Sequence, residues 1–216
     1  MSILDDISAF LQKGRANETK AAVEKALEEG VGAKDILEGG LMAGMNIIGG
    51  KFKRNEVYVP EVLIAARAMN AGLLPLKPHL VSSGVKSRGS VVIGTVKGDL
   101  HDIGKNLVKM MMEGKGFEVH DLGVDVSSEK FVNAAREFNA DIVCCSALLT
   151  TTMTEMKSVV EALKASGLRD KLAIMVGGAP VTDSFCKSIG ADLYSPDAAS
   201  AADAAVAVIE SVAKSA

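Results

Sequence analysis

The second part of this chain repeats one pattern five times, and that repetition constrains the fold more than any other feature. Apolar runs of strand length alternate with stretches of helical character. The runs fall at 90–96, 118–122, 141–146, 171–176 and 193–195, and the helices near 103–115, 128–138, 152–165, 183–189 and 198–212. Runs such as SVVIGTV and DIVCC are apolar throughout, which is typical of strands buried on both faces of a parallel sheet. Because crossovers are right-handed, the repeat predicts a doubly wound, flavodoxin-like (Rossmann-like) α/β sheet of five strands.

The first part of the chain has the periodicity of helices only. Helices are expected at 2–13, 17–29, 32–52 and 57–80, with Asn17 as a candidate N-cap and Pro60 in the first turn of the last one. Four helices with short connections favour an antiparallel bundle. The polar stretch SSGVKSRG at 82–89 is typical of a linker. The sequence therefore predicts a helical domain at 1–85 and a sheet domain at 90–216.

Charge and composition exclude several kinds of partner. The 24 Lys and Arg are mixed with 27 Asp and Glu, so no basic patch predicts nucleic-acid binding. The N-terminal sequence lacks a basic region followed by an apolar core, and no apolar run approaches the roughly 20 residues that span a bilayer. We therefore expect a cytoplasmic protein without a membrane partner. Cys144 and Cys145 lie in an apolar run and are expected to be buried free thiols.

Four loops that follow strands carry the chemistry. The carboxyl ends of parallel strands share one edge of the sheet, where ligands bind in such folds. The loops are KGDLHDIGK at 97–105, SALLTTT at 146–152, GGAP at 177–180 and SPDAAS at 195–200. They contain no G-x-G-x-x-G dinucleotide turn, no phosphate loop with Lys-Ser/Thr, and no phosphoacceptor Asp after the third strand. What they offer is one histidine between carboxylates, a run of hydroxyls and a glycine pair.

The histidine of the first loop has the setting of a metal ligand. A ligating imidazole usually donates its second ring N–H to a carboxylate or carbonyl, which fixes its tautomer. Asp99 lies two residues before His101 in the same loop and can accept that hydrogen bond. A lone loop histidine is more often a surface or capping residue, but that interpretation leaves the hydroxyl and glycine loops unexplained.

Three of these loops together resemble a known signature. The segments DLHDIG (99–104), SAL (146–148) and GG (177–178) resemble the D-x-H-x-x-G, S-x-L, G-G pattern of cobalamin-binding proteins. The helical part, above all KFKRNEVYVPEVLIAARAMNAGL at 51–73, is similar to the cap that precedes this domain in methionine synthase and in the corrinoid proteins of anaerobic methyltransferase systems. The resemblance covers the whole chain.

The resemblance implies a cofactor and its binding residues. The cofactor would be cobalamin, as methylcobalamin or cob(I)alamin, bound base-off with His101 as the lower axial ligand of cobalt. Asp99 would orient His101, and Thr152 would complete the triad where methionine synthase has a serine. The remaining implied contacts are Leu100, Asp102, Ile103, Gly104, Ser146, Leu148, Thr150, Gly177, Gly178 and Asp197, with Tyr58 and Met69 over the upper corrin face. For the last two the alternative is a place in the bundle core, because apolar residues at helical spacing are more often core than cofactor cap.

The function implied is that of a methyl carrier that is not itself an enzyme. It would shuttle a methyl group on cobalt between a substrate-specific methyltransferase and a second methyltransferase that acts on tetrahydrofolate or a thiol, with a reductive activator as a further partner. The linker at 82–89 would act as a hinge. The alternatives are a cobalamin-responsive regulator, for which no DNA-binding helices precede the helical part, a mutase small subunit, and a flavodoxin-like domain without a cofactor. No residue identifies the methyl donor.

Overall fold

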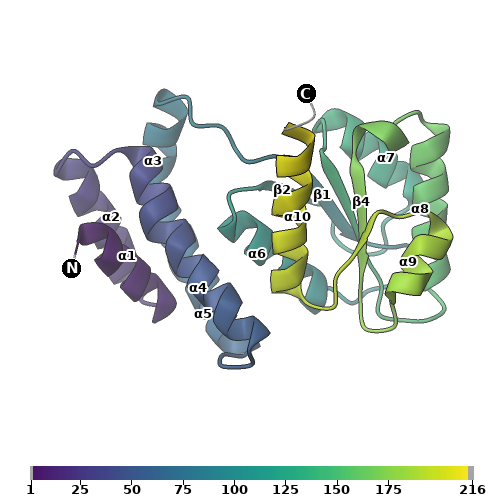
Figure 1. Cartoon of the computed structure of the whole chain (residues 1–216), viewed down its shortest axis with the longest axis horizontal. Helices are drawn as coiled ribbons and strands as arrows, with labels where there is room; N and C mark the ends of the chain where they lie inside the picture. Colours follow the sequence, from purple (N-terminus) through teal and green to yellow (C-terminus); the bar gives the residue numbers. More distant parts are fainter. Residues whose placement is uncertain (1, 214–216) are drawn as a thin grey trace. The chain divides into compact units, whose positions relative to one another are not determined.

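The computed structural model describes residues 2–213, which form two compact units (Figure 1). One unit runs up to Ser87 and includes Gly114–Gly116; the other comprises Arg88–Glu113 and the chain from Phe117 onward.

The first unit is helical, as the sequence predicts. Its elements are α1 (Ile3–Gln12), α2 (Ala16–Glu28), α3 (Ala33–Asp35), the π-helical η1 (Ile36–Met42), α4 (Ala43–Lys53) and α5 (Val59–Ser82). Since α3, η1 and α4 follow one another without a break, they form the third of the four predicted helices. A capping box of Ser2 and Asp5 begins α1, and Pro60 lies in the first turn of α5 as predicted. The prediction that Asn17 caps α2 is wrong, because the helix already begins at Ala16 and Arg15 occupies the cap.

The longest helix, α5, supplies the centre of this unit. It is long and apolar enough to cross a membrane by length and composition alone, with a mean hydropathy of 1.2. However, Val62, Ala65, Met69 and Leu76 are buried, which is the pattern of a core helix in a bundle. Gly72 lets another helix approach, because a Cβ there would lie 2.7 Å from Leu41 Cδ2.

The second unit is the predicted five-stranded sheet. Its strands are β1 (Ser90–Thr95), β2 (Glu118–Asp121), β3 (Ile142–Ser146), β4 (Ala173–Gly177) and β5 (Leu193–Tyr194). The helices are α6 (Ile103–Gly114), α7 (Ser128–Glu137), α8 (Met153–Ala165), η2 (Arg169–Lys171), α9 (Asp183–Ile189) and α10 (Ala198–Ala213). All strand pairs are parallel, in the order β2-β1-β3-β4-β5, which is the flavodoxin-like order.

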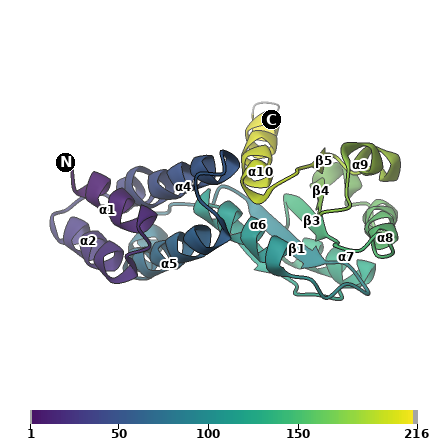
Figure 2. The same cartoon turned by 90° about the horizontal axis from the view of Figure 1, so that it is seen from below.

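Helices cover both faces of this sheet (Figure 2). The face formed by Val92, Val143 and Ile174 packs against α7, α8 and α9, with Phe131 among the fully buried side chains. The other face is covered by α6 and α10. The prediction of buried free thiols is confirmed for Cys144 and Cys145, and burial raises the pKa of the Cys144 thiol to about 12.

The strand register sets the site. Thr95 pairs with Ser146, and Ser146 pairs with Gly177, so three neighbouring strands end in one row. The order of strands reverses between β1 and β3, and ligands bind at such switch points. The loops after β1, β3 and β4 therefore meet where the topology favours a binding site.

Candidate functional site

A buried carboxylate and an exposed imidazole form the centre of the β1–α6 loop. Asp99 has no exposed surface, whereas the His101 side chain is 52% exposed. Asp99 Oδ1 lies 2.8 Å from His101 Nδ1 and also accepts a hydrogen bond from the His101 backbone N–H at 3.0 Å. An ionised carboxylate only accepts hydrogen bonds, so Nδ1 carries the hydrogen and Nε2 is the ring nitrogen that this contact leaves available. The arrangement presents one imidazole donor atom toward solvent.

The second oxygen of Asp99 is held by the loop after β3. Asp99 Oδ2 accepts hydrogen bonds from the N–H groups of Leu148 (2.8 Å) and Leu149 (3.3 Å) and from Thr152 Oγ1 (2.7 Å). Thr152 itself is buried. Burial by itself raises the pKa of Asp99, but the hydrogen bonds from Thr152, His101 and Leu148 outweigh it and hold the pKa well below its ordinary value. Asp99 is therefore ionised at neutral pH.

Two further residues, Thr95 and Asp125, fix the backbone of this loop. The buried Thr95 donates its hydroxyl to the carbonyl oxygen of His101 at 2.9 Å. On the β2 side, the Asp125 N–H donates to the carbonyl of Asp99 at 3.0 Å, and Asp125 Oδ1 accepts from the Gly98 N–H at 2.7 Å. Thr95 and Asp125 did not emerge from the sequence, since nothing in a hydroxyl at a strand end or an acid after the next strand marks this role.

The glycine pair at the end of β4 lies beside the loop after β3. A Cβ on Gly178 would lie 1.8 Å from the carbonyl oxygen of Ala147, and Gly178 has a φ of 137°. The close approach of the two loops therefore requires glycine. At Gly177 a Cβ would meet only the carbonyl oxygen of Ser195, at 3.7 Å, so the protein itself leaves room there.

The loops that hold the histidine and its carboxylate also carry apolar side chains that are not buried. The exposed large hydrophobic residues of these loops are Leu100, Ile103, Leu148 and Leu149. Exposed apolar clusters on a soluble unit mark a binding surface. Next to a free imidazole nitrogen, this surface suits a large, flat and partly apolar ligand.

The other residues predicted from the sequence lie on the same loops, with different contacts. Asp102 precedes α6 and accepts a hydrogen bond from Asn106 Nδ2 at 3.0 Å. Asp197 accepts from the N–H and the hydroxyl of Ser200, so it caps α10. Ser146 is partly buried, and Gly104 and Thr150 are exposed. Their contacts to a cofactor remain predictions.

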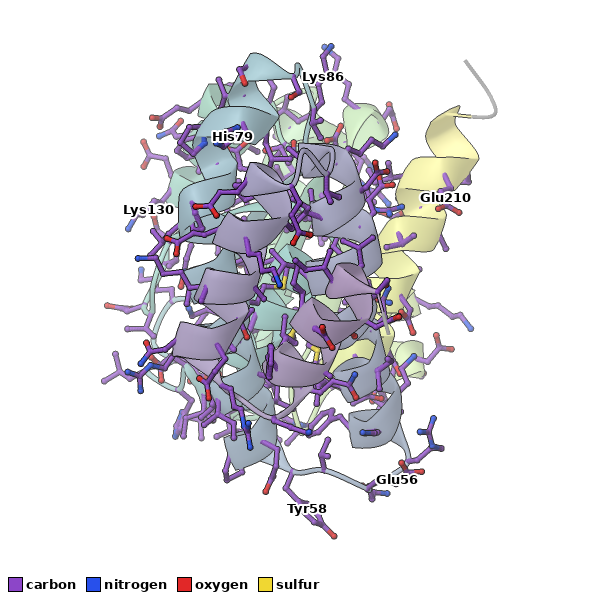
Figure 3. All side chains as sticks on the ribbon, turned by 90° about the vertical axis from the view of Figure 1, so that its left-hand side faces the viewer. Glu56, Tyr58, His79, Lys86, Lys130 and Glu210 are labelled. Atoms are coloured by element: carbon purple, nitrogen blue, oxygen red, sulfur yellow. The ribbon has the colours of Figure 1, made fainter. Side chains whose placement is uncertain are left out.

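Tyr58 and Met69, the two residues of the helical unit that were predicted to cover the corrin, differ in exposure. Tyr58 is 64% exposed and projects from the ribbon at the start of α5 (Figure 3). Met69 is buried within the described structure. Its burial favours a role in the core over one in cofactor contact.

An ion pair between a buried lysine and a partly exposed carboxylate lies beside the loop, and it did not emerge from the sequence. Lys105 is 2% exposed, and its Nζ lies 2.7 Å from each carboxylate oxygen of Asp121. Burial raises the pKa of Asp121, but the hydrogen bond and charge of Lys105 lower it by more. Lys105 is the last residue of the KGDLHDIGK segment, but the spacing of apolar residues does not show whether a lysine is buried or exposed.

The described residues contain no group of three or more His, Cys, Asp or Glu side chains placed to hold a metal ion. A macrocycle that brings its own nitrogen ligands fits a single protein imidazole, the apolar surface and the space at Gly177.

Comparison with known families matches both units. A family model described as a B12 binding domain matches residues 89–206, and a second model with the same description matches residues 3–77. The dimethylamine corrinoid protein of Methanosarcina barkeri is 44% identical over 200 residues, which are 92% of this chain and 93% of that protein.

Two solved structures are also similar over nearly the whole chain. A chain of the methanol:cobalamin methyltransferase complex of Methanosarcina barkeri aligns with a TM-score of 0.86 at 30% identity, covering 96% of this chain and 80% of that one. A cobalamin-binding protein of Desulfitobacterium hafniense aligns with a TM-score of 0.79 at 32% identity, covering 95% and 98%. The likeness thus joins sequence, fold and the order of the two units.

Proposed function

Because this chain belongs to the family of cobalamin-binding corrinoid proteins of methyltransferase systems, we propose that it carries a methyl group between two enzymes on the cobalt of a bound corrinoid. The observation that carries the proposal is His101, whose Nδ1 is held by the buried Asp99 at 2.8 Å while Nε2 stays free. The alternatives of a regulator and of a mutase small subunit are not favoured, since the relatives described above are corrinoid and cobalamin-binding proteins.

In this proposal each part of the site has a separate task. His101 would hold the cobalt of the cofactor through Nε2. Leu100, Ile103 and Leu148 offer apolar surface beside the imidazole, and Gly177 leaves space for the nucleotide tail. Ser146 and Thr150 offer hydroxyls toward that tail.

The chain's own residues also manage charge at the ligand. When bound, the corrinoid supplies a cobalt atom whose bond to a methyl group can be made and broken. Asp99 makes His101 a more basic ligand, because it accepts the Nδ1 hydrogen. Thr152 donates to Asp99 and keeps that carboxylate in place.

As a methyl carrier, the chain would work with partner enzymes in the cytoplasm. One partner is a substrate-specific methyltransferase, which is supported by the likeness to a chain of a methyltransferase complex. The second is a methyltransferase that acts on tetrahydrofolate or a thiol, and a reductive activator restores the carrier. The chain itself performs no catalysis and works in the cytoplasm.

The test is the absorption spectrum of the protein reconstituted with hydroxocobalamin, for wild type and His101→Ala. We expect stoichiometric uptake by the wild type with the spectrum of a histidine-ligated corrinoid, and loss of that spectrum in the variant because the donor nitrogen is gone. His79→Ala is the matched control, since His79 is an exposed histidine of the helical unit. An identical spectrum in wild type and His101→Ala would contradict the assignment of the ligand, and no uptake by the wild type would contradict the proposal as a whole.

A further inference from the structure

Lys105 occupies a position that elementary electrostatics disfavours. It is the third residue of α6 (Ile103–Gly114), where the helix dipole favours anions over cations. It is also 2% exposed, and lysine is almost never buried without a partner because its charge loses hydration. The position of Lys105 is unfavourable for the helix dipole and for the hydration of its charge, so helix formation does not explain why a lysine lies there.

The ammonium group of Lys105 is fully occupied. Its Nζ donates hydrogen bonds to both oxygens of Asp121 and to Asn106 Oδ1, each at 2.7 Å. These three acceptors match the three N–H donors of an ammonium. The geometry defines one position for the side chain and therefore for the first turn of α6.

The partner carboxylate is fixed as well. Asp121 is the last residue of β2, where it pairs with Ile93 of β1. Its Oδ1 also accepts a hydrogen bond from the Gly123 N–H at 2.9 Å. The ion pair thus joins the start of α6 to the carboxyl end of β2. The neighbouring strand, β1, leads into the loop that carries His101.

The network continues from Lys105 to the residue after the histidine. Asn106, which accepts from Lys105, donates its Nδ2 hydrogen to Asp102 Oδ2 at 3.0 Å, and its backbone N–H donates to the Asp102 carbonyl at 2.8 Å. On the other side, the carbonyl of His101 is held by Thr95 of β1. The peptide of His101 therefore lies between two anchors, one on β1 and one on the end of β2.

We propose that Lys105 and Asp121 are positioning residues that set where His101 presents its free ring nitrogen. The inference deepens the proposed function and rests on it. Stability alone does not explain the pair, because burial of the Lys105 charge costs hydration free energy that attraction to a partly exposed carboxylate does not reliably recover. What the pair adds is a fixed distance between α6 and the end of β2. Because the loop that carries Asp99 and His101 connects β1 to α6, the position of α6 also sets the position of this loop.

The test compares two double variants. Lys105→Met/Asp121→Leu removes the charges of this pair together, so that Lys105 is not left buried without its carboxylate. Lys109, whose Nζ lies 3.7 Å from Asp121 Oδ2, also loses this partner, but its side chain is 32% exposed and reaches water. Arg169→Met/Asp192→Leu is the matched control: Arg169 Nη2 lies 2.7 Å from Asp192 Oδ1, and Asp192 Oδ2 accepts the Ile174 N–H as Asp121 accepts that of Gly123. Asp192 precedes β5, at the opposite edge of the sheet. Urea unfolding of all proteins establishes how far each variant loses stability.

Two measurements then decide the matter. In the cofactor-free protein, the ¹⁵N chemical shifts of the His101 ring report its tautomer and its bond to Asp99. In the reconstituted protein, hydroxocobalamin affinity and the histidine-ligated spectrum report the position of Nε2. We expect the Lys105→Met/Asp121→Leu variant to shift the ring signals, to bind about 10-fold more weakly and to lose part of the ligated spectrum, as loss of a supporting residue does at metal sites. The control should match wild type in each.

The outcomes separate the inference from the function it rests on. Wild-type ring signals and affinity in the Lys105→Met/Asp121→Leu variant, or equal losses in the control, would overturn the positioning role. If the wild type takes up no corrinoid, the proposed function fails, while the ring signals of the cofactor-free protein still decide the role of the pair. Should the double variant not fold, Asp121→Asn, which keeps the shape and weakens the bond to Lys105, is expected to change the same signals in the same direction.

Discussion

Replacement of Gly178 by alanine is expected to destabilise the sheet unit by about 3 kcal/mol or more. The reason is a collision of main chains, since the new Cβ would lie 1.8 Å from the Ala147 carbonyl oxygen. A backbone oxygen cannot move aside as the end of a flexible side chain does. The φ of 137° at Gly178 adds strain, because residues with a Cβ rarely adopt it. Urea or thermal unfolding of the cofactor-free protein measures the loss.

Gly177→Ala is the matched control for this prediction. A Cβ at Gly177 would lie 3.7 Å from the Ser195 carbonyl oxygen, which is an ordinary contact. We expect stability within about 1 kcal/mol of wild type and weaker uptake of hydroxocobalamin, because the methyl group would fill space proposed for the nucleotide tail. Equal stability of the two alanine variants would show that the loops after β3 and β4 separate more easily than their geometry indicates.

Asp99→Ala is expected to cost on the order of 3 kcal/mol of unfolding free energy. The buried carboxylate accepts hydrogen bonds from the N–H groups of Leu148 and Leu149, from Thr152 Oγ1 and from the His101 N–H. Truncation leaves these donors without their acceptor inside the protein, and each unsatisfied buried group costs about 1–3 kcal/mol. Thr152 retains an alternative acceptor in the Leu149 carbonyl at 3.0 Å, so the sum is smaller than four full penalties. Chemical unfolding at neutral pH tests the prediction.

The same carboxylate predicts a pH dependence with a definite sign. The folded pKa of Asp99 lies below its ordinary value of 3.8, so the unfolded chain binds the proton more readily. The stabilisation is therefore complete above about pH 4 and is lost progressively as the pH falls from there toward the folded pKa. Asp99→Asn, which cannot titrate, should show a shallower fall in stability below pH 4 than wild type. Parallel curves for the two proteins would contradict the depressed pKa.

Most of the fold could be predicted because the second unit uses strongly periodic elements. The strands at 142–146 and 173–177 lie within two residues of the predicted runs, since apolar runs buried on both faces leave little ambiguity. The helix boundaries of the first unit were harder to predict. Its π-helical stretch at 36–42 has no signature in hydrophobic spacing, and the start of α2 was misplaced because a favourable capping residue was available at Asn17 but not used.

The site was predictable where chemistry is local in sequence. Asp99 and His101 are two residues apart, so their contact follows from the loop alone. Thr95, Asp125 and the pair of Lys105 with Asp121 depend on which strand ends lie side by side. The flavodoxin-like prediction implies the order of the strands, but it does not give the register that brings these side chains together.

The hydrogen bonds of Asp99 also have a consequence for how the protein is made. They join the loop after β1 to the loop after β3, so the interior of the sheet unit is not satisfied until both loops are in place. Correct folding and assembly of the ligand loop are thus one event rather than two. A newly synthesised chain that has misplaced this loop carries buried donors without acceptors and is exposed to proteolysis as a partly unfolded molecule. Cellular quality control would in this way also select for chains that are ready to receive their cofactor.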